Sequence, residues 1–216
     1  MSAAAQRLSP AAAPAEATQP VAAEWAAALI QSRRTVLPKR LLAPGPDPQQ
    51  LEAILGAARA APDHGEILPW RLVLVPAEVR PALGEAFSQA LLERDAAASA
   101  EQCAQAREKA FRSPTLMLAI ARFGAPADEI PAAERLVSAG CALQNMLLMA
   151  TALGFGSALT SGKALQSEVL RRLFQLAPDE QAICFVSVGT CASPPRPARR
   201  RPETRQYVSC LTCESA

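Results

Sequence analysis

The stretch AERLVSAGCALQNMLLMATALG, residues 133 to 154, decides how this chain folds. At helical spacing it is apolar on nearly every side, so a helix here must be buried on more than one side. Polar residues such as Gln144 and Asn145 interrupt it, which favours a buried helix over a membrane span. We therefore predict a long central helix, and in so small a chain a subunit interface is a natural way to cover its second side.

Shorter periodic segments lie on both sides of this helix. Helical spacing predicts further helices over 22–32 (with Trp25 and Leu29 on one face), from Asp47 and Pro48 onward, and over 82–94, 100–111 and 167–176. Strands are predicted over 71–76, 115–121 and 182–189, and the second of these is expected to be buried on both faces. Residues 154–162, GFGSALTSG, are interpreted as a glycine-rich connection. Helices and strands without regular alternation favour an α+β fold.

Composition limits the class of protein. Half of the 216 residues are apolar and the formal net charge is +2, so the sequence predicts one domain with a real core, and neither a nucleic acid nor a membrane as partner. We expect that domain over 21–191, after a disordered, Ala- and Pro-rich extension at 1–20 that lacks the pattern of a secretory signal. An irregular Pro- and Arg-rich tail is expected over 192–216. Six scattered cysteines suit a reducing cytoplasm.

Several common catalytic and binding motifs are missing from the sequence. No G-x-G-x-x-G follows a predicted strand, and there is neither a P-loop nor a G-x-S-x-G elbow. Cys210 and Cys213 form a single C-x-x-C without a second pair, so we expect no metal site. The sequence offers no clear catalytic side chain.

Three short segments remain as candidates for a site. SRRT, 32–35, has two guanidinium groups and a hydroxyl that suit a phosphate, although composition alone favours a solvated basic turn. APDHGEILPW, 61–70, holds the only histidine, His64, which is either a donor to a ligand or a loop residue bound to local backbone. In GFGSALTSG, glycine would let the backbone approach a flat ligand, unless the segment is an ordinary connection.

Taken in this order, the segments resemble the nitroreductase family of flavoproteins, most closely its small members, over residues 24 to 190. The resemblance implies an α+β homodimer with a central, mainly antiparallel sheet flanked by helices, in which dimerisation completes the domain. It implies two FMN molecules at the subunit interface, and a central helix that packs against its partner's copy.

The resemblance also implies roles for individual residues. Arg33, Arg34 and Thr35 would hold the FMN phosphate and part of the ring, and His64 would reach the flavin from the neighbouring chain. The segment that lines the other side of the flavin would be Leu159, Thr160 and Ser161. Two basic residues of the tail before Pro202 are either further phosphate ligands, as in larger family members, or solvated: Arg199 and Arg201.

By the same resemblance, the activity would be FMN-dependent transfer of hydride from NADH or NADPH to nitroaromatic or quinone acceptors by a ping-pong mechanism. The flavin would carry the chemistry, so no catalytic side chain is needed. The small branch often has arginine in place of Ala60, and tryptophan and arginine in place of Leu159 and Thr160. Two alternatives therefore stay open: a flavin-binding protein of this fold with little turnover, and a colourless helical protein that only dimerises.

Overall fold

The computed structural model describes residues 19–125, 128–192 and 201–211. Nearly all of the expected N-terminal extension lies outside these residues, as do Arg199 and Cys213. The described part of the tail, 201–211, has one short 3-10 turn, Thr204–Gln206, and is otherwise irregular.

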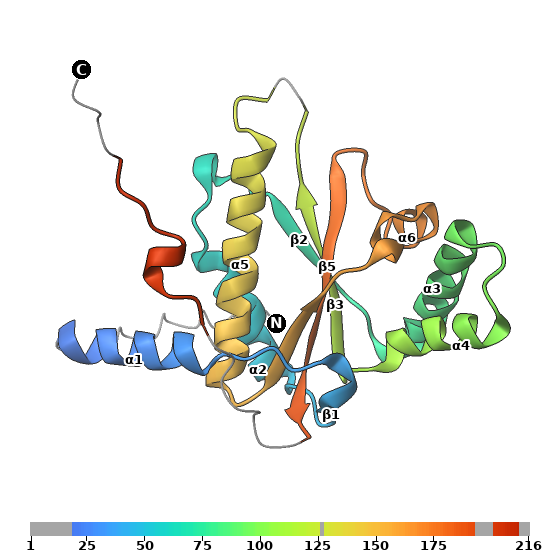
Figure 1. Cartoon of the computed structure of the whole chain (residues 1–216), viewed down its shortest axis with the longest axis horizontal. Helices are drawn as coiled ribbons and strands as arrows, with labels where there is room; N and C mark the ends of the chain where they lie inside the picture. The colour runs from blue at the N-terminus through green and yellow to red at the C-terminus, as the bar shows by residue number, and fades with distance from the viewer. Residues whose placement is uncertain (1–18, 126–127, 193–200, 212–216) are drawn as a thin grey trace, which may run out of the picture.

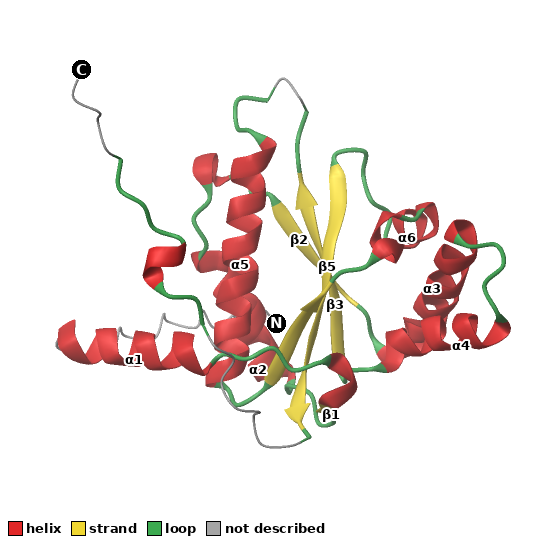
Figure 2. Cartoon of the chain, viewed as in Figure 1, coloured by secondary structure: helices red, strands yellow, loops and turns green. Residues whose placement is uncertain are grey.

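One antiparallel sheet forms the centre of the fold (Figure 2). The long strand β5 pairs with β3, which in turn pairs with β2, and β5 also pairs with β4 and β1. The strands are β1 (Leu41–Leu42), β2 (Trp70–Leu74), β3 (Thr115–Arg122), β4 (Gly156–Thr160) and β5 (Glu180–Cys191). Every pairing between these strands is antiparallel, which confirms the predicted α+β class with a central antiparallel sheet.

The helices flank the sheet, and all but the first of them cover its two faces (Figure 1). They are α1 (Gln19–Ser32), α2 (Pro48–Ala57), α3 (Arg80–Arg94), α4 (Ala100–Glu108), α5 (Ala132–Ala152) and α6 (Glu168–Leu173). α2 and α5 lie on one face, while α3, α4 and α6 lie on the other. α2 begins as predicted, because the Asp47 side chain accepts from the Gln50 N–H while the Gln50 side chain accepts from the Asp47 N–H.

Strand β3 separates two hydrophobic cores, and its burial on both faces is confirmed. Leu118 and Ile120 face a cluster formed with α3 and α6, whereas Met117 and Ala119 face a cluster formed with α2 and α5. The period of two along a strand sends alternate side chains to opposite faces. Because β3 is apolar at consecutive positions, it supplies side chains to both cores.

The long helix α5 is buried on one side only within this chain. Met146 and Ala150 are fully buried against the sheet, but the exposed fractions of Leu136 and Val137 are 42% and 66%. Helix α1 lies beside the C-terminal end of α5 and extends away from the sheet, and its Trp25 is 68% exposed (Figure 1). The predicted second apolar side of α5 therefore lies open in the single chain. None of the helices in the described ranges is long and apolar enough to cross a membrane.

The prediction of a connection over 154–162 is wrong, because this segment contains strand β4. Gly154, with φ of 84°, ends α5 in the left-handed conformation that favours glycine. At Gly156 a Cβ would lie 2.6 Å from the Cys191 Sγ and 2.8 Å from a Leu41 methyl carbon, so this glycine serves strand packing and not a ligand. Within the segment, Gly154 and Gly162 have open space where a side chain would be.

Candidate functional site

The first and third candidate segments lie side by side. The chain leaves α1 at Ser32 and pairs with β4 through a parallel bridge between Thr35 and Ser157. The N–H of Val36 donates to the Ser157 carbonyl at 2.9 Å. This bridge places the two arginines of SRRT next to the strand that carries Leu159.

Three guanidinium groups gather at the C-terminal end of α1. Arg34 donates to the carbonyl oxygens of Gln31 and Arg33. Arg201, from the distant C-terminal segment, donates to the same two oxygens at 3.3 and 3.4 Å. Unpaired carbonyls at the end of a helix attract cations, so the helix end itself helps to collect these charges.

The charge of this arginine cluster (Arg33, Arg34 and Arg201) is not balanced by an acidic side chain. Among the described residues no carboxylate forms an ion pair with any of its three members. Burial lowers the pKa of Arg33, and the positive charges of Arg201 and then Arg34 lower it further. A bound dianion would relieve this repulsion, and guanidinium forks match phosphate oxygens. The donor set therefore fits the phosphate of a nucleotide-like cofactor.

Two residues beyond the bridged Ser157, β4 becomes accessible. Leu159 is 41% exposed and lies opposite Val186, whose side chain belongs to the α2–α5 core. Thr160 lies opposite Phe185, which belongs to the other core, so the side chains of Leu159 and Thr160 point to opposite faces. A flat ligand on the α5 side of this strand would meet the Leu159 side chain and only the backbone of Thr160. Ser161 follows, exposed.

His64 is at the opposite end of α5. Its Nδ1 lies 2.8 Å from Oε2 of Glu134, in the first turn of that helix. The arginine cluster is near the helix's other end, since β4 begins four residues after Ala152. Because α5 has 21 residues, it is about 30 Å long at 1.5 Å per residue. One chain therefore does not bring His64 and the arginine cluster together.

The loop around His64 has an unusual backbone. Gly65, Glu66 and Leu68 have φ of 73°, 53° and 46°, and the left-handed region is costly for the last two. The Asp63 carboxylate holds this loop by accepting from the Leu68 N–H at 2.8 Å. Sequence reasoning missed Glu134, whose only signal was an acidic residue in the first turn of a helix.

Arg59, which precedes Ala60, forms a hydrogen bond within its own segment. Its Nε donates to the carbonyl of Gly56 at 3.2 Å, one turn back along the chain. The side chain therefore lies along its own helical segment, as the rotation of about 100° between neighbouring helical residues suggests.

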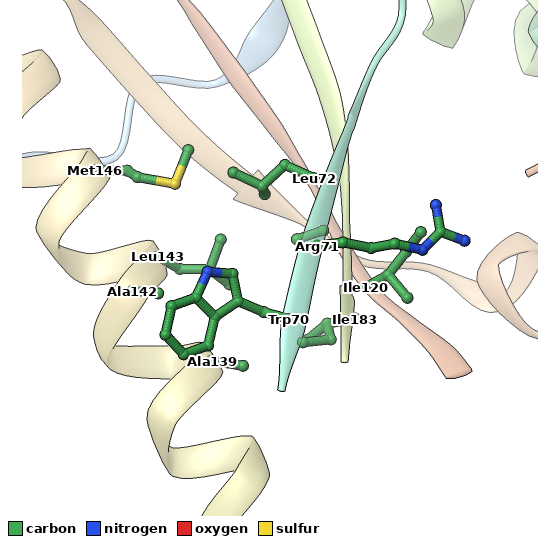
Figure 3. A pocket seen from close by; sticks show the side chains of 10 residues that line it. Trp70, Arg71, Leu72, Ile120, Ala139, Ala142, Leu143, Met146 and Ile183 are labelled. Carbon is green, nitrogen blue, oxygen red and sulfur yellow. The ribbon is translucent and has the colours of Figure 1, made fainter. Parts of the chain in front are cut away.

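An apolar cavity lies between α5 and the sheet, next to Trp70 (Figure 3). Trp70 and Leu143 line it, while the Arg71 side chain extends away from α5. Its volume of about 10 Å³ is room for roughly one water molecule, so it is far too small for a cofactor. Among the described residues, no group of three or more His, Cys, Asp or Glu side chains is arranged to hold a metal ion.

Comparison with known proteins agrees with this geometry. A family model described as "Nitroreductase family" matches residues 30–190. A Haemophilus influenzae protein named "Putative NAD(P)H nitroreductase" is 31% identical over 173 residues, which are 80% of this chain and 93% of the relative. The Escherichia coli K12 protein named "Putative NAD(P)H nitroreductase YdjA" is 34% identical over 164 residues, 75% of this chain and 86% of the relative.

Solved structures share the fold. A nitroreductase-like family protein from Bacillus cereus superposes with a TM-score of 0.73 at 20% identity, covering 85% of this chain and 95% of the other. A mutant of NfnB, an FMN- and NADPH-dependent nitroreductase from Sphigopyxis sp. strain HMH, gives 0.66 at 18% identity, covering 85% and 97%. A Bacteroides fragilis nitroreductase with bound FMN gives 0.62 at 19% identity, covering 86% and 98%.

Proposed function

This chain belongs to the nitroreductase family, and on that premise we propose that it is an FMN-dependent oxidoreductase. It takes hydride from NADH or NADPH and reduces a small-molecule acceptor such as a nitroaromatic or a quinone. The names of its relatives and of the FMN-containing neighbours support this reading. The proposed domain is residues 21–191, assisted by the tail through Arg201.

The observation that carries the proposal is the arginine cluster next to the start of β4, the strand whose other end is open. Three guanidinium groups meet there, and none is neutralised by a described carboxylate. The FMN phosphate would bind Arg33 and Arg34 together with the Thr35 hydroxyl. The flavin ring would then lie along the exposed segment Leu159, Thr160 and Ser161.

The position of His64 supports a homodimer. If two α5 helices pack antiparallel about a two-fold axis, the start of one helix lies beside the end of the other. The partner's His64 would then approach this chain's arginine cluster, which its own His64 cannot reach. The exposed side chains of Leu136 and Val137 on α5 give such an interface an apolar surface.

Bound FMN would supply the two-electron chemistry, so the chain's own residues need only bind, orient and shield it. The arginine cluster would anchor the phosphate, and Leu159 would present an apolar surface next to the ring. One open face must serve the nicotinamide and the acceptor in turn, which gives ping-pong kinetics. We also propose a cytoplasmic location, in keeping with the free thiols that the described residues contain at Cys103, Cys141, Cys184, Cys191 and Cys210.

A second candidate is a flavin-binding protein with little turnover. Arg59 lies along its own helical segment, and Leu159 and Thr160 carry no charge. A cation near the ring would stabilise its anionic reduced form, so its loss should lower the reduction potential. This candidate predicts a yellow protein that neither nicotinamide reduces at a useful rate.

The visible spectrum of the purified protein tests both candidates. The oxidoreductase should be yellow, or become so once FMN is added and the unbound FMN is removed, and anaerobic NADH or NADPH should bleach it. A quinone or nitroaromatic added afterwards should restore the colour. Colour without bleaching would favour the flavin-binding candidate. A protein that is colourless after FMN is added and the unbound FMN is removed would contradict both.

A further inference from the structure

We propose that Glu134 is a positioning residue for His64. It holds the Nδ1 side of the imidazole and so presents Nε2 as the ring nitrogen that meets the cofactor of the neighbouring subunit. The inference rests on the proposed function for the identity of that cofactor, but the ring geometry is tested separately below.

The contact joins two distant parts of the chain. Glu134 and His64 are 70 positions apart, and Oε2 lies 2.8 Å from Nδ1. A carboxylate in the first turn of α5 is stabilised by the positive end of the helix dipole. A helix that extends along the interface therefore supplies a fixed acceptor for a residue that stands on a loop.

Stability alone gives a weak reason for this pair. The side chains of His64 and Glu134 are 68% and 51% exposed, and exposed ion pairs contribute little to folding. Orientation is a better reason, because hydrogen bonds from outer partners commonly fix the tautomer and direction of a functional imidazole.

The chemistry of the contact determines which nitrogen is free. An ionised carboxylate only accepts hydrogen bonds, so Nδ1 must carry a proton to bind Glu134. Nε2 then offers a lone pair if the ring is neutral, or an N–H if the ring is protonated. In either state Nε2 is the atom available to a ligand.

The backbone of the loop also supports the positioning role. Glu66 and Leu68 hold left-handed conformations, and the Asp63 carboxylate fixes Leu68 through its N–H. A Cβ on Gly65 would lie 2.8 Å from a methyl carbon of Ile130, so the loop is also packed closely against the segment that leads into α5. Strained backbone held in this way is typical of preorganised sites.

The only histidine of the chain allows a direct test. Nitrogen-15 labelling of histidine gives one pair of ring signals, which reports the tautomer of His64 in the full-length protein. At a pH where the ring is neutral, we expect Nδ1 to be protonated and Nε2 bare, with or without FMN. Glu134→Ala should return the ring to the Nε2–H form that dominates in an unconstrained histidine side chain. The control Glu101→Ala, in the first turn of α4, should leave the signals unchanged.

A ring protonated on Nε2 in the unaltered protein, or a tautomer that Glu134→Ala does not change, would overturn the proposal. This readout needs no cofactor, so it stands even if the protein proves not to bind FMN.

A second measurement joins the pair to the cofactor. Glu134→Ala should weaken FMN binding about tenfold, the order expected for one oriented hydrogen bond. In a His64→Ala background the same change should have no further effect, because Glu134 acts through the imidazole. An equal loss in both backgrounds would show that Glu134 acts independently of His64 and would contradict the positioning role.

Discussion

The two faces of the sheet differ in how far a single chain completes them. On the face covered by α3 and α6, Phe185 makes edge-to-face contacts with Phe87 and Phe174, at ring-centroid distances of 5.4 and 6.0 Å. On the other face, α5 buries one side and leaves Val137 exposed. The first face is a closed core. The second face carries the candidate site and, by our proposal, needs another subunit.

On the closed face, even a buried arginine has acceptors for its hydrogen-bond donors. Arg80 is 6% exposed, and its guanidinium donates to four backbone carbonyls. These belong to Val75, Ala110, Ser113 and Pro114. Burial lowers the pKa of Arg80, yet the side chain is fully engaged within the chain. The arginine cluster beside β4 lacks comparable acceptors for all of its donors. We infer that the face with unmatched positive charge is the functional one.

The largest effect is expected from Val137→Asp. In a two-fold interface each copy would bury an unpaired carboxylate, at a cost of about 3–5 kcal/mol each. The protein should become monomeric at micromolar concentration and lose FMN, while its fold is retained, because Val137 is exposed within the chain. Light scattering and the ratio of flavin to protein measure this. Leu92→Asp on α3, also at an exposed apolar residue, should stay dimeric. A dimeric Val137→Asp protein would place the interface elsewhere.

Phe185→Ala should damage the closed core directly. Truncating a buried phenylalanine costs about 3–5 kcal/mol of unfolding free energy. The loss should be the same at low and high protein concentration, because the contacts of Phe185 lie within one chain. Urea unfolding at two concentrations tests this. A loss that shrinks as the protein is concentrated would show that the face is not complete in one subunit.

Glu180→Gln tests the electrostatics of the closed face. The hydrogen bonds from Arg71 are the main cause that lowers the pKa of Glu180 to about 2, from a usual value of 4.5. A carboxyl group with a lowered pKa stabilises the fold above its unfolded pKa and loses this contribution as pH falls through the folded value. We expect a loss of about 3 kcal/mol at pH 7.

The difference between the native protein and Glu180→Gln should shrink between about pH 4.5 and pH 2. Urea denaturation across this range measures it. A difference that stays constant with pH would mean that packing, and not charge, explains the effect of the substitution.

The smallest effect is expected at the site itself. Arg33→Ala should weaken FMN binding by about 1.5–3 kcal/mol, the value of a hydrogen bond to a charged group, with little change in unfolding free energy. Arg94→Ala on α3 is the matched control on the closed face. Calorimetric titration of the apoprotein with FMN provides the measurement. Unchanged affinity in Arg33→Ala would count against the phosphate assignment.

Elements with strong local signals could be predicted from the sequence. The capped start of α2, the apolar run of β3 and the long apolar α5 all lie where periodicity placed them. β4 was missed because the glycines in and around it resemble a connection, and a five-residue strand is stabilised mainly by its pairing with β5, far along the chain. The two residues of β1 were too few to give any periodic signal.

The candidate site was predicted in part. SRRT and the segment after α5 stood out by their residue types, and Arg201 was a candidate from the tail. Their meeting at one helix end depends on the Thr35–Ser157 bridge and on the path of the C-terminal segment. No local pattern encodes either contact.

The sequence by itself determined the α+β class, the central helix and the residue types available for a site, because periodicity and residue type are local properties. Only the tertiary structure decided which groups meet: three arginines near one end of α5, and His64 with Glu134 at the other. The physical reason is that such meetings depend on sheet pairing and helix length, which act over tens of residues. Within one chain, the length of α5 keeps His64 apart from the arginine cluster.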